Sequence, residues 1–349
     1  MSLLVLSAKD VDAVVQKLTP QELMLLMGKV FAALQQDVPE EVSPKPVQLP
    51  HRIALHLPSH TTLFMPSRLA SAGGSAMKVV SVPLEHSQHG LPATTMVMDE
   101  ESGRVRAVVN ARSLTAVRTA AGSGLAVSII GPRNPETLVL FGAGLQMLYH
   151  GLLLLRMYPS IRSCTVVNRT GNARLESVMK ALSRAFPKIL LRSLSSSDKE
   201  NESAIQDAVS AAHIICSATS ATRPLYDSDW VSPGTCIVLA GSYKPSMHEV
   251  SSRLVKRASI VVVDSRSACL REAGELIAAN LTWEDLVELG DLLDVDGRPL
   301  PGLIDTKTNS SGDVTIFKSV GIGLQDVAIA NLVVEQALSM GLGTEIDYD

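Results

Sequence analysis

The chain has 349 residues and a formal net charge of −4, from 31 Lys and Arg against 35 Asp and Glu. A single hydrophobic core rarely grows beyond about 250–300 residues, so this length predicts two domains. The charge balance excludes a strongly cationic surface for nucleic-acid phosphates, and 3% aromatic residues leave few platforms for base stacking. A hydrophobic content of 46% also excludes a disordered chain.

The cysteines, histidines and apolar segments narrow the class of protein further. The four cysteines form no CxxC pair, so we expect buried free thiols and no zinc ribbon or disulfide framework. The spacing of His51, His56 and His60 is more typical of surface histidines than of a zinc site. The first residues lack a basic signal-peptide region, and no window approaches the ~18 apolar residues of a membrane span. We therefore expect a cytoplasmic globular protein with no metal, membrane or nucleic-acid partner.

The first 130 residues predict an α+β domain. Thr19-Pro20 is a typical helix start, and apolar residues at helical spacing continue it to Gln35. Strand-like runs separated by turn residues then indicate an antiparallel sheet. These runs are 53–57, 62–65, 76–82, 95–98 and 107–109. A helix rich in small residues is expected from Leu114 to Ile130.

From Leu138 the pattern changes to short apolar strands that alternate with helices. Such alternation predicts a doubly wound parallel sheet, that is, a Rossmann-type α/β domain. The expected strands are 138–141, 164–167, 213–217, 236–240 and 259–264, with helices at 146–157 and 172–186. Ser193–Ser197 is interpreted as a loop, and the helix at 321–340 is assigned to the first domain because its composition resembles that of 114–130. The predicted division is 1–130, 131–318 and 319–349, with the second part inserted into a substrate-binding and dimerisation domain.

Gly142-Ala143-Gly144 follows a predicted strand and opens a predicted helix, which is the setting of a dinucleotide-binding turn. The first glycine permits the tight turn, and the second lets the backbone approach a pyrophosphate at the helix amino end. Met147 stands where a third glycine is usual, so the match is imperfect. A plain structural turn is the alternative interpretation.

The end of the next predicted strand carries the signal for the cofactor's phosphate. Enzymes that use NAD usually place an acidic residue there, whereas this chain has Asn168 followed by Arg169, with Arg174 in the next helix. A 2′-phosphate favours arginines and is repelled by a carboxylate. The pattern therefore favours NADP(H), with NAD(H) possible, and two surface arginines in a loop are the alternative.

Three cations lie in apolar segments of the first domain. Arg118 interrupts a helix of small residues, Lys78 lies within an apolar strand and Arg52 opens another. A buried cation is costly unless it meets an anion, so these side chains are candidates for binding a substrate carboxylate. Side chains that reach solvent or form internal salt bridges are the alternative.

These residues together carry a resemblance to the ornithine cyclodeaminase/mu-crystallin family, in the same order along nearly the whole chain. The segments that resemble the family are Arg118-Thr119-Ala120-Ala121, Phe141-Gly142-Ala143-Gly144-Leu145-Gln146, Asn168-Arg169-Thr170, Ser217-Ala218-Thr219-Ser220, Phe317-Lys318-Ser319-Val320-Gly321 and Gln325-Asp326, with Met65-Pro66 and Gly297-Arg298. The resemblance implies a Rossmann domain inserted into a substrate domain built from both chain ends. It also implies a homodimer, with a small substrate bound near the nicotinamide.

The resemblance assigns roles to individual residues. It places the substrate carboxylate at Arg52, Lys78 and Arg118, the substrate beside Val320, and a catalytic proton relay or imine polarisation at Lys78. The implied cofactor positions are Ala143, Gln146, Asn168, Arg169, Thr170, Thr219 and Ser319. Asp326 is interpreted as a helix-packing or hydrogen-bonding residue.

One departure from the family pattern bears on the reaction. Where cyclodeaminases carry a catalytic aspartate in a Gly-Gly-Asp segment, this chain is interpreted as having Ser242. A serine cannot hold the negative charge that would bind a cationic amine or accept its proton. We therefore expect an NADPH-dependent reductase of imino acids, with cyclic ketimines such as Δ1-pyrroline-2-carboxylate as candidate substrates. The alternatives are an ornithine cyclodeaminase or amino-acid dehydrogenase, and an NADPH-gated small-ligand-binding protein of the crystallin type.

Overall fold

The computed structural model describes residues 2–36, 39, 41–83, 91–302 and 312–348. The chain divides into two compact units. The first unit comprises Met1–Arg118, Val295–Gly297 and Ile322–Asp349, and the second comprises Thr119–Asp294 and Arg298–Gly321. Both units are therefore assembled from segments that are distant in the sequence.

The first unit is built on an eight-stranded mixed sheet. Its strands run in the order β16-β1-β7-β6-β5-β4-β2, with β3 paired to β4. The bounds are β1 Ser2–Leu6, β2 Val47–Gln48, β3 Ile53–His56, β4 His60–Leu69, β5 Gly74–Pro83, β6 Ala93–Met98, β7 Val105–Asn110 and β16 Thr344–Asp347. All pairs are antiparallel except β1 with β7. The predicted antiparallel strands are confirmed, whereas β1 and β16 at the chain ends were not predicted.

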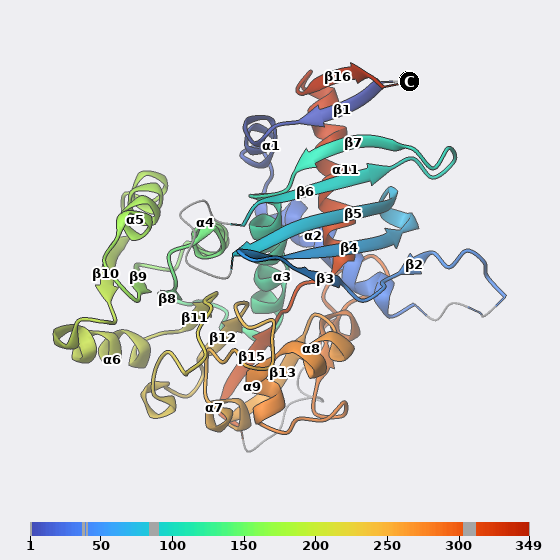
Figure 1. Ribbon diagram of the computed structural model, residues 1–349. Helices are drawn as coiled ribbons and strands as arrows, with labels where there is room; N and C mark the ends of the chain where they lie inside the picture. The colour runs from blue at the N-terminus through green and yellow to red at the C-terminus, as the bar shows by residue number, and fades with distance from the viewer. Residues whose placement is uncertain (1, 37–38, 40, 84–90, 303–311, 349) are drawn as a thin grey trace. The chain divides into compact units, whose positions relative to one another are not determined.

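Helix α11 (Gly323–Ser339) packs against β4, β5 and β6 of this sheet, as Figure 1 shows. Residues along β5 alternate between buried and half-buried positions, as expected for a strand with one face against the core. Lys78 falls on the buried face with Ala76 and Val80. The strand period therefore directs a lysine into the interior of the first unit.

Two shorter helices and the close approach of two glycines complete the first unit. Helices α1 (Ala8–Val15) and α2 (Pro20–Leu34) both begin with a capping box, closed by Ser7 with Asp10 and by Thr19 with Glu22. A Cβ at Gly28 of α2 would lie 2.1 Å from the carbonyl oxygen of Gly297. This backbone contact explains why Val295–Gly297 belongs to the first unit although the segments on either side of it belong to the second.

The second unit is a parallel eight-stranded sheet in the order β10-β9-β8-β11-β12-β15-β13-β14. Its strands are β8 Thr137–Phe141, β9 Ser163–Asn168, β10 Leu190–Ser195, β11 Ile214–Ser217, β12 Cys236–Leu239, β13 Ala258–Val263, β14 Val287–Glu288 and β15 Val314–Lys318. Its helices include α4 Leu145–Met157, α5 Ala173–Ala185, α6 Glu202–Ser210, α7 Ser252–Lys256, α8 Arg266–Glu272 and α9 Gly274–Ala278. The predicted doubly wound sheet is confirmed. The order reverses at β8, which pairs with β9 on one side and β11 on the other, and this is where such sheets bind ligands.

Two features of the second unit differ from the sequence prediction. Strand β10 runs to Ser195, so the predicted loop at Ser193–Ser197 is wrong for its first three residues, which pair with β9. Strand β15 inserts between β12 and β13 from a late part of the chain, and sequence periodicity gave no indication of its place.

Helix α3 (Leu114–Ile130) has the predicted bounds, but the division between units falls inside it, at Arg118, and again after Gly321, instead of at 130 and 318. The contacts of α3 explain this difference. Arg118 near its start contacts α11, whereas Ser123 and Gly124 pack against His150, Leu153 and Met157 of α4. All four cysteines are free and buried, as predicted. Among the described residues, no helix is long and apolar enough to cross a membrane.

Candidate functional site

A buried cluster of two cations and one carboxylate lies in the first unit. The Lys78 ammonium nitrogen lies 2.6 Å from Oδ2 of Asp326, and Nε of Arg118 donates a hydrogen bond of 3.2 Å to Oδ1 of the same carboxylate. Their side chains are 2–4% exposed. Lys78 comes from β5, Arg118 from α3 and Asp326 from α11, so the structure brings together two of the three predicted carboxylate ligands.

Gln325 holds the arginine of this cluster in place. Its Oε1 accepts a hydrogen bond of 2.9 Å from Nη1 of Arg118. Its Nε2 donates to the backbone oxygen of Arg118 at 3.5 Å, and it contacts the sulfur of Met27 at 3.6 Å. Nε and Nη1 of Arg118 thus have partners, whereas Nη2 has none among the described residues. The guanidinium is oriented and retains one edge with hydrogen-bonding capacity.

The cluster contains more positive than negative charge. Burial lowers the pKa of Lys78 to about 8; the charges of Arg118 and, to a smaller degree, Arg52 also lower it, and Asp326 opposes the shift. Burial disfavours the ionised form of Asp326, but Arg118 and Lys78 outweigh burial and hold its pKa below the usual value. One carboxylate therefore faces two buried cations, and the charge of half-buried Arg52 adds to theirs. Such a cluster can accept a second anion.

Sequence reasoning missed the role of Asp326 as the counter-ion of this cluster. Its interpretation as a buried hydrogen-bonding residue is right, but it pairs with the two cations and does not only pack the helix. The pattern carried a signal: Gln325 and Asp326 are adjacent polar residues in the mainly apolar first half of a helix, while Lys78 and Arg118 are isolated cations in apolar segments. Matching buried charges of opposite sign would have found the pair.

The turn between β8 and α4 has the geometry of a dinucleotide-binding turn. Gly142 has φ of 114°, which favours glycine, and its N–H donates to the Val167 carbonyl at 2.8 Å. Gly144 precedes α4, no side chain caps the helix there, and a Cβ at this position would meet open space. An uncapped helix amino end beside open space fits a pyrophosphate. The residues present therefore fit the pyrophosphate of a dinucleotide.

Two side-chain contacts join α4 to α3 behind this turn. Gln146 donates a hydrogen bond of 3.5 Å to the Thr119 hydroxyl. Nδ1 of His150 lies 2.7 Å from the Gln146 carbonyl oxygen, and its Nε2 lies 2.9 Å from the Ser123 hydroxyl. Because a carbonyl only accepts, Nδ1 carries the proton and Nε2 accepts from Ser123. Burial lowers the pKa of His150 to about 4, so the ring is neutral near pH 7.

The end of β9 provides a polar, partly cationic loop. Asn168 donates a hydrogen bond of 2.8 Å to the Thr170 carbonyl, and Asn172 caps α5 by accepting from the N–H groups of Arg174 and Leu175. Arg169, Thr170 and Arg174 are exposed. No acidic side chain occupies the position of Asn168.

The end of strand β10 and the residues just after it contact this loop, and sequence reasoning did not assign them to the site. The Arg169 carbonyl accepts from the Ser195 hydroxyl at 3.2 Å and from the Ser197 N–H at 2.8 Å. Ser195 and Ser197 thus border the loop at the end of β9. The pairing of β10 with β9 brings them there, and that pairing could not be read from their spacing.

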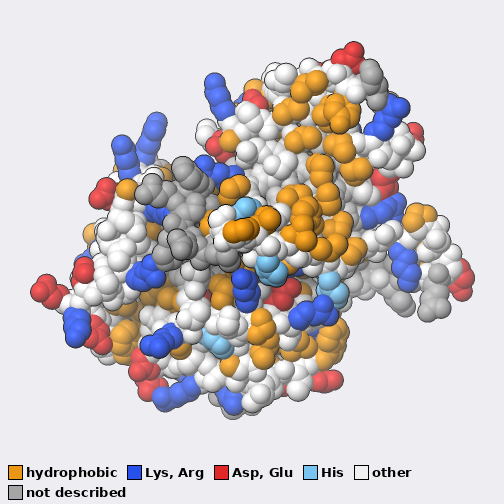
Figure 2. Space-filling view, viewed as in Figure 1, with side chains coloured by type: hydrophobic (Ala, Val, Ile, Leu, Met, Phe, Trp, Pro, Cys, Tyr) orange, Lys and Arg blue, Asp and Glu red, His pale blue; other side chains and the backbone are white. Residues whose placement is uncertain are grey.

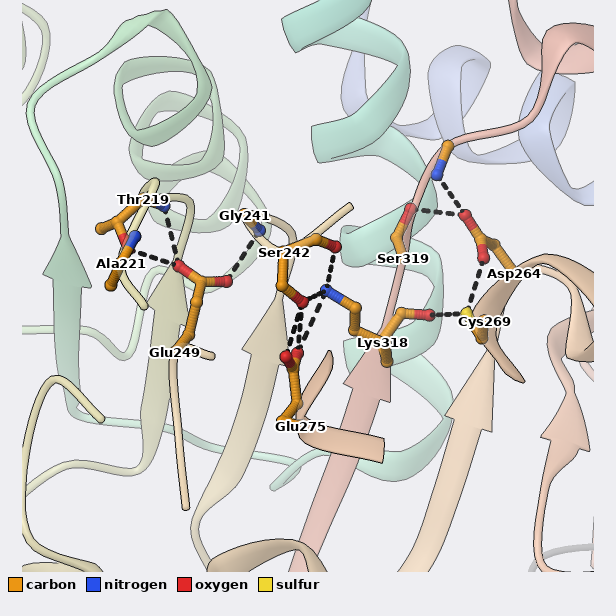
Figure 3. Close-up of polar contacts among 11 residues, drawn as sticks. Thr219, Ala221, Gly241, Ser242, Glu249, Asp264, Cys269, Glu275, Lys318 and Ser319 are labelled. Atoms are coloured by element: carbon orange, nitrogen blue, oxygen red, sulfur yellow. Dashed lines mark hydrogen bonds and ion pairs between the residues drawn. The ribbon is translucent and has the colours of Figure 1, made fainter. Parts of the chain in front are cut away.

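Buried carboxylates link the loops at the carboxyl ends of the remaining strands (Figure 3). Glu249 accepts from the N–H groups of Thr219 and Gly241, both at 2.7 Å, and from the Thr219 hydroxyl at 3.0 Å. Asp264 accepts from the Ser319 hydroxyl and the Gly321 N–H, both at 2.7 Å. Burial raises the pKa of Glu249. Thr219 and Ser319, both assigned to the cofactor, are therefore each held by a carboxylate.

Ser242 is fully buried in a third linkage of the same kind (Figure 3). Its hydroxyl lies 2.6 Å from the ammonium nitrogen of Lys318 and 2.6 Å from Oε2 of Glu275, and Lys318 and Glu275 form an ion pair of 3.1 Å. The hydroxyl is thus saturated inside the second unit. Its surroundings do contain a carboxylate, but Lys318 neutralises it.

The fold and these residues define a Rossmann-type protein with a candidate dinucleotide site. The sequence of residues 9–341 matches the family model of the ornithine cyclodeaminase/mu-crystallin family. The chain belongs to this family. The resemblance found in the sequence is thereby confirmed.

Relatives with assigned activities lie at about 30% identity. Ketimine reductase mu-crystallin of Rattus norvegicus is 30% identical over 77% of this chain and 78% of its own. A Δ1-pyrroline-2-carboxylate reductase of Bacillus cereus is 30% identical over 83% of this chain and 85% of its own.

Solved structures confirm the fold. The Δ1-pyrroline-2-carboxylate reductase of Thermococcus litoralis, in complex with NADH and L-proline, aligns with a TM-score of 0.80 at 22% identity, over 99% of this chain and 100% of its own. An archaeal alanine dehydrogenase dimer with bound NAD aligns with a TM-score of 0.78 at 21% identity, over the full length of both chains.

Because His150 is buried in its neutral form, we expect the free energy of unfolding to depend on pH. Its pKa is about 4 in the folded chain, against the ordinary histidine value of 6.5, so the unfolded chain takes up a proton first as the pH falls. Stability is therefore lost between about pH 6.5 and 4, by up to about 3 kcal/mol from this group. Urea unfolding at several pH values should show this loss in the wild type and a smaller one in His150→Gln. Parallel pH profiles of the two proteins would contradict the assignment.

Proposed function

We propose that this oxidoreductase is an NADPH-dependent reductase of imino acids, with cyclic ketimines such as Δ1-pyrroline-2-carboxylate as its substrate class. The observation that carries the proposal is the buried Lys78–Arg118–Asp326 cluster, in which two cations share one carboxylate. The relatives named above that act on ketimines and pyrroline carboxylates support the substrate class.

The first unit's part in the proposed reaction is to bind and polarise the substrate. Arg118, oriented by Gln325 and Asp326, offers its remaining edge to the substrate carboxylate, and Arg52 adds positive charge nearby. Lys78, whose pKa is about 8, holds a proton near neutral pH and can release it to the imine side. Asp326 keeps that proton at Lys78 by stabilising the ammonium form.

The second unit's part is to bind and orient the cofactor, which supplies the hydride when bound. Gly142, Ala143 and Gly144, with Gln146 behind them, form the proposed pyrophosphate site. Asn168, Arg169, Thr170 and Arg174 form the proposed site of the 2′-phosphate. Thr219 and Ser319 are proposed to contact the nicotinamide half, and Val320 the substrate.

The assay that tests this function follows NADPH and NADH absorbance with Δ1-pyrroline-2-carboxylate. We expect NADPH to be oxidised with a much higher kcat/KM than NADH, because a charged contact to the 2′-phosphate is lost with NADH. Arg169→Ala should reduce this preference about tenfold or more. Arg184→Ala, at the other end of α5, serves as the matched control and should keep it. Oxidation of neither cofactor, or a preference for NADH, would contradict the proposal.

The role of Lys78 predicts a pH dependence and a mutational effect. Because the protonated amine is required, kcat/KM should fall as the pH rises through about 8. Lys78→Met should lower kcat more than ~100-fold. Lys78→Arg keeps the charge but cannot release a proton, so it should restore substrate binding and not turnover. Unchanged turnover in Lys78→Met would remove this residue from the mechanism.

We further propose that the protein is a homodimer that pairs through the outer face of the first unit's sheet. In register across β3, β4 and β5, this face presents Ile53, Phe64 and Val79; across β4 to β7 it presents Pro66, Met77, Met96 and Val108. Ile53 is 59% and Leu55 52% exposed, and Figure 2 shows hydrophobic side chains gathered over these strands. An exposed apolar patch of this kind typically marks an interface.

Light scattering during size-exclusion chromatography tests the dimer. We expect the wild type to be dimeric and the double variant Ile53→Asp/Leu55→Asp to be monomeric, because two carboxylates would be buried in the interface. Val295→Asp, at a position 80% exposed in the same unit, is the control and should remain dimeric. A monomeric wild type, or a double variant that stays dimeric, would contradict the proposal.

A further inference from the structure

The buried carboxylates at the carboxyl edge of the parallel sheet fix the hydrogen-bonding direction of two hydroxyl groups (Figure 3). A carboxylate only accepts, so the Thr219 hydroxyl donates its proton to Glu249 and the Ser319 hydroxyl donates its proton to Asp264. Glu249 and Asp264 are 0% and 1% exposed, so water does not compete for these contacts. Each hydroxyl can then only accept further hydrogen bonds. The Thr219 hydroxyl already accepts one, of 3.3 Å, from the Ala221 N–H, which leaves it one lone pair for a ligand.

The backbone keeps both pairs in register. Glu249 also binds the N–H groups of Thr219 and Gly241, which joins the loops after β11 and β12. Asp264 also binds the Gly321 N–H, which joins the end of β13 to the turn after β15. The carboxylates thus fix the position as well as the polarity of the two hydroxyls.

A group restricted to accepting cannot bind phosphate oxygens, which themselves accept at neutral pH. It matches ligand donors, and the nicotinamide half of the cofactor has two kinds, ribose hydroxyls and the carboxamide NH2. The sheet order separates them. From the Gly142–Gly144 turn after β8, Thr219 follows the adjacent strand β11, whereas Ser319 follows β15, three strands away and roughly 14 Å along the edge. The carboxamide is the end of the cofactor farther from the pyrophosphate.

We propose that Asp264 is a positioning residue that fixes Ser319 as the acceptor for the carboxamide NH2 of the nicotinamide, and that Glu249 fixes Thr219 in the same way for a ribose hydroxyl. This inference rests on the proposed function, since it requires the second unit to bind a nicotinamide dinucleotide. It gives Asp264 and Glu249 a role in orienting the cofactor, although neither residue takes part in the hydride transfer itself.

The test measures binding, by fluorescence titration, of NADPH and of its reduced 3-acetylpyridine analogue, in which a methyl group replaces the NH2. The wild type should bind NADPH about tenfold more tightly, the effect of one net hydrogen bond. In Ser319→Ala the two ligands should bind within about twofold of each other. In Asp264→Asn the new amide donates to Ser319, which frees its hydroxyl to donate, so the preference should vanish or reverse.

Two controls keep the outcomes distinct. Thr219→Val should weaken both ligands equally and keep the tenfold ratio. Ser217→Ala should leave both affinities unchanged, because the buried Ser217 hydroxyl has no hydrogen-bond partner among the described residues. A ratio of ten retained in Ser319→Ala, or lost only in Thr219→Val, would overturn the inference and leave the proposed function standing. A wild type that binds neither ligand would overturn both. If Asp264→Asn does not fold, the Ser319→Ala result decides.

Discussion

The carboxylate of Asp326 is the constraint on which the first unit depends. It lies between two cations that are themselves almost fully buried, and removal of one partner from such a group typically costs about 3–5 kcal/mol. Strand β5, helix α3 and helix α11 each contribute one member. The ion pairs therefore form only when these three elements pack against one another. Both cations contact the carboxylate, so neither lacks a partner. Because one carboxylate faces two cations, the cluster still carries a net positive charge. That surplus is what makes it a candidate anion site.

Buried carboxylates also hold together the loops at the carboxyl edge of the second unit's sheet. Loops that leave parallel strands carry unpaired backbone N–H groups. Glu249 and Asp264 satisfy three of them, and together with Glu275 they join neighbouring strands. Glu249 joins the loops after β11 and β12, Glu275 with Lys318 joins β12 to β15, and Asp264 joins β13 to β15. The edge is therefore preorganised, which lowers the cost of ordering it when a ligand binds.

The elements that depend on local residue spacing could be predicted from the sequence. The period of two along β5, the helix over 114–130 and the glycine turn after β8 all follow from residue spacing. The features that depend on the order of strands in the sheet could not be predicted. The place of β15 between β12 and β13 brings Lys318 to Glu275 and Ser319 to Asp264, and no local pattern encodes that place. The pairing of Asp326 with Lys78, 248 positions earlier in the sequence, was also missed, although the isolated buried charges of opposite sign pointed to it.

We propose that the surplus positive charge around Asp326 binds a substrate carboxylate. Calorimetric titration of the NADP⁺-loaded protein with L-proline and with L-prolinamide tests it most directly, since the two ligands differ only in that charge. We expect L-proline to bind, and L-prolinamide to bind at least about 100-fold more weakly because a buried charged contact is lost. Equal affinities for the two ligands would show that the cluster is only a structural ion pair.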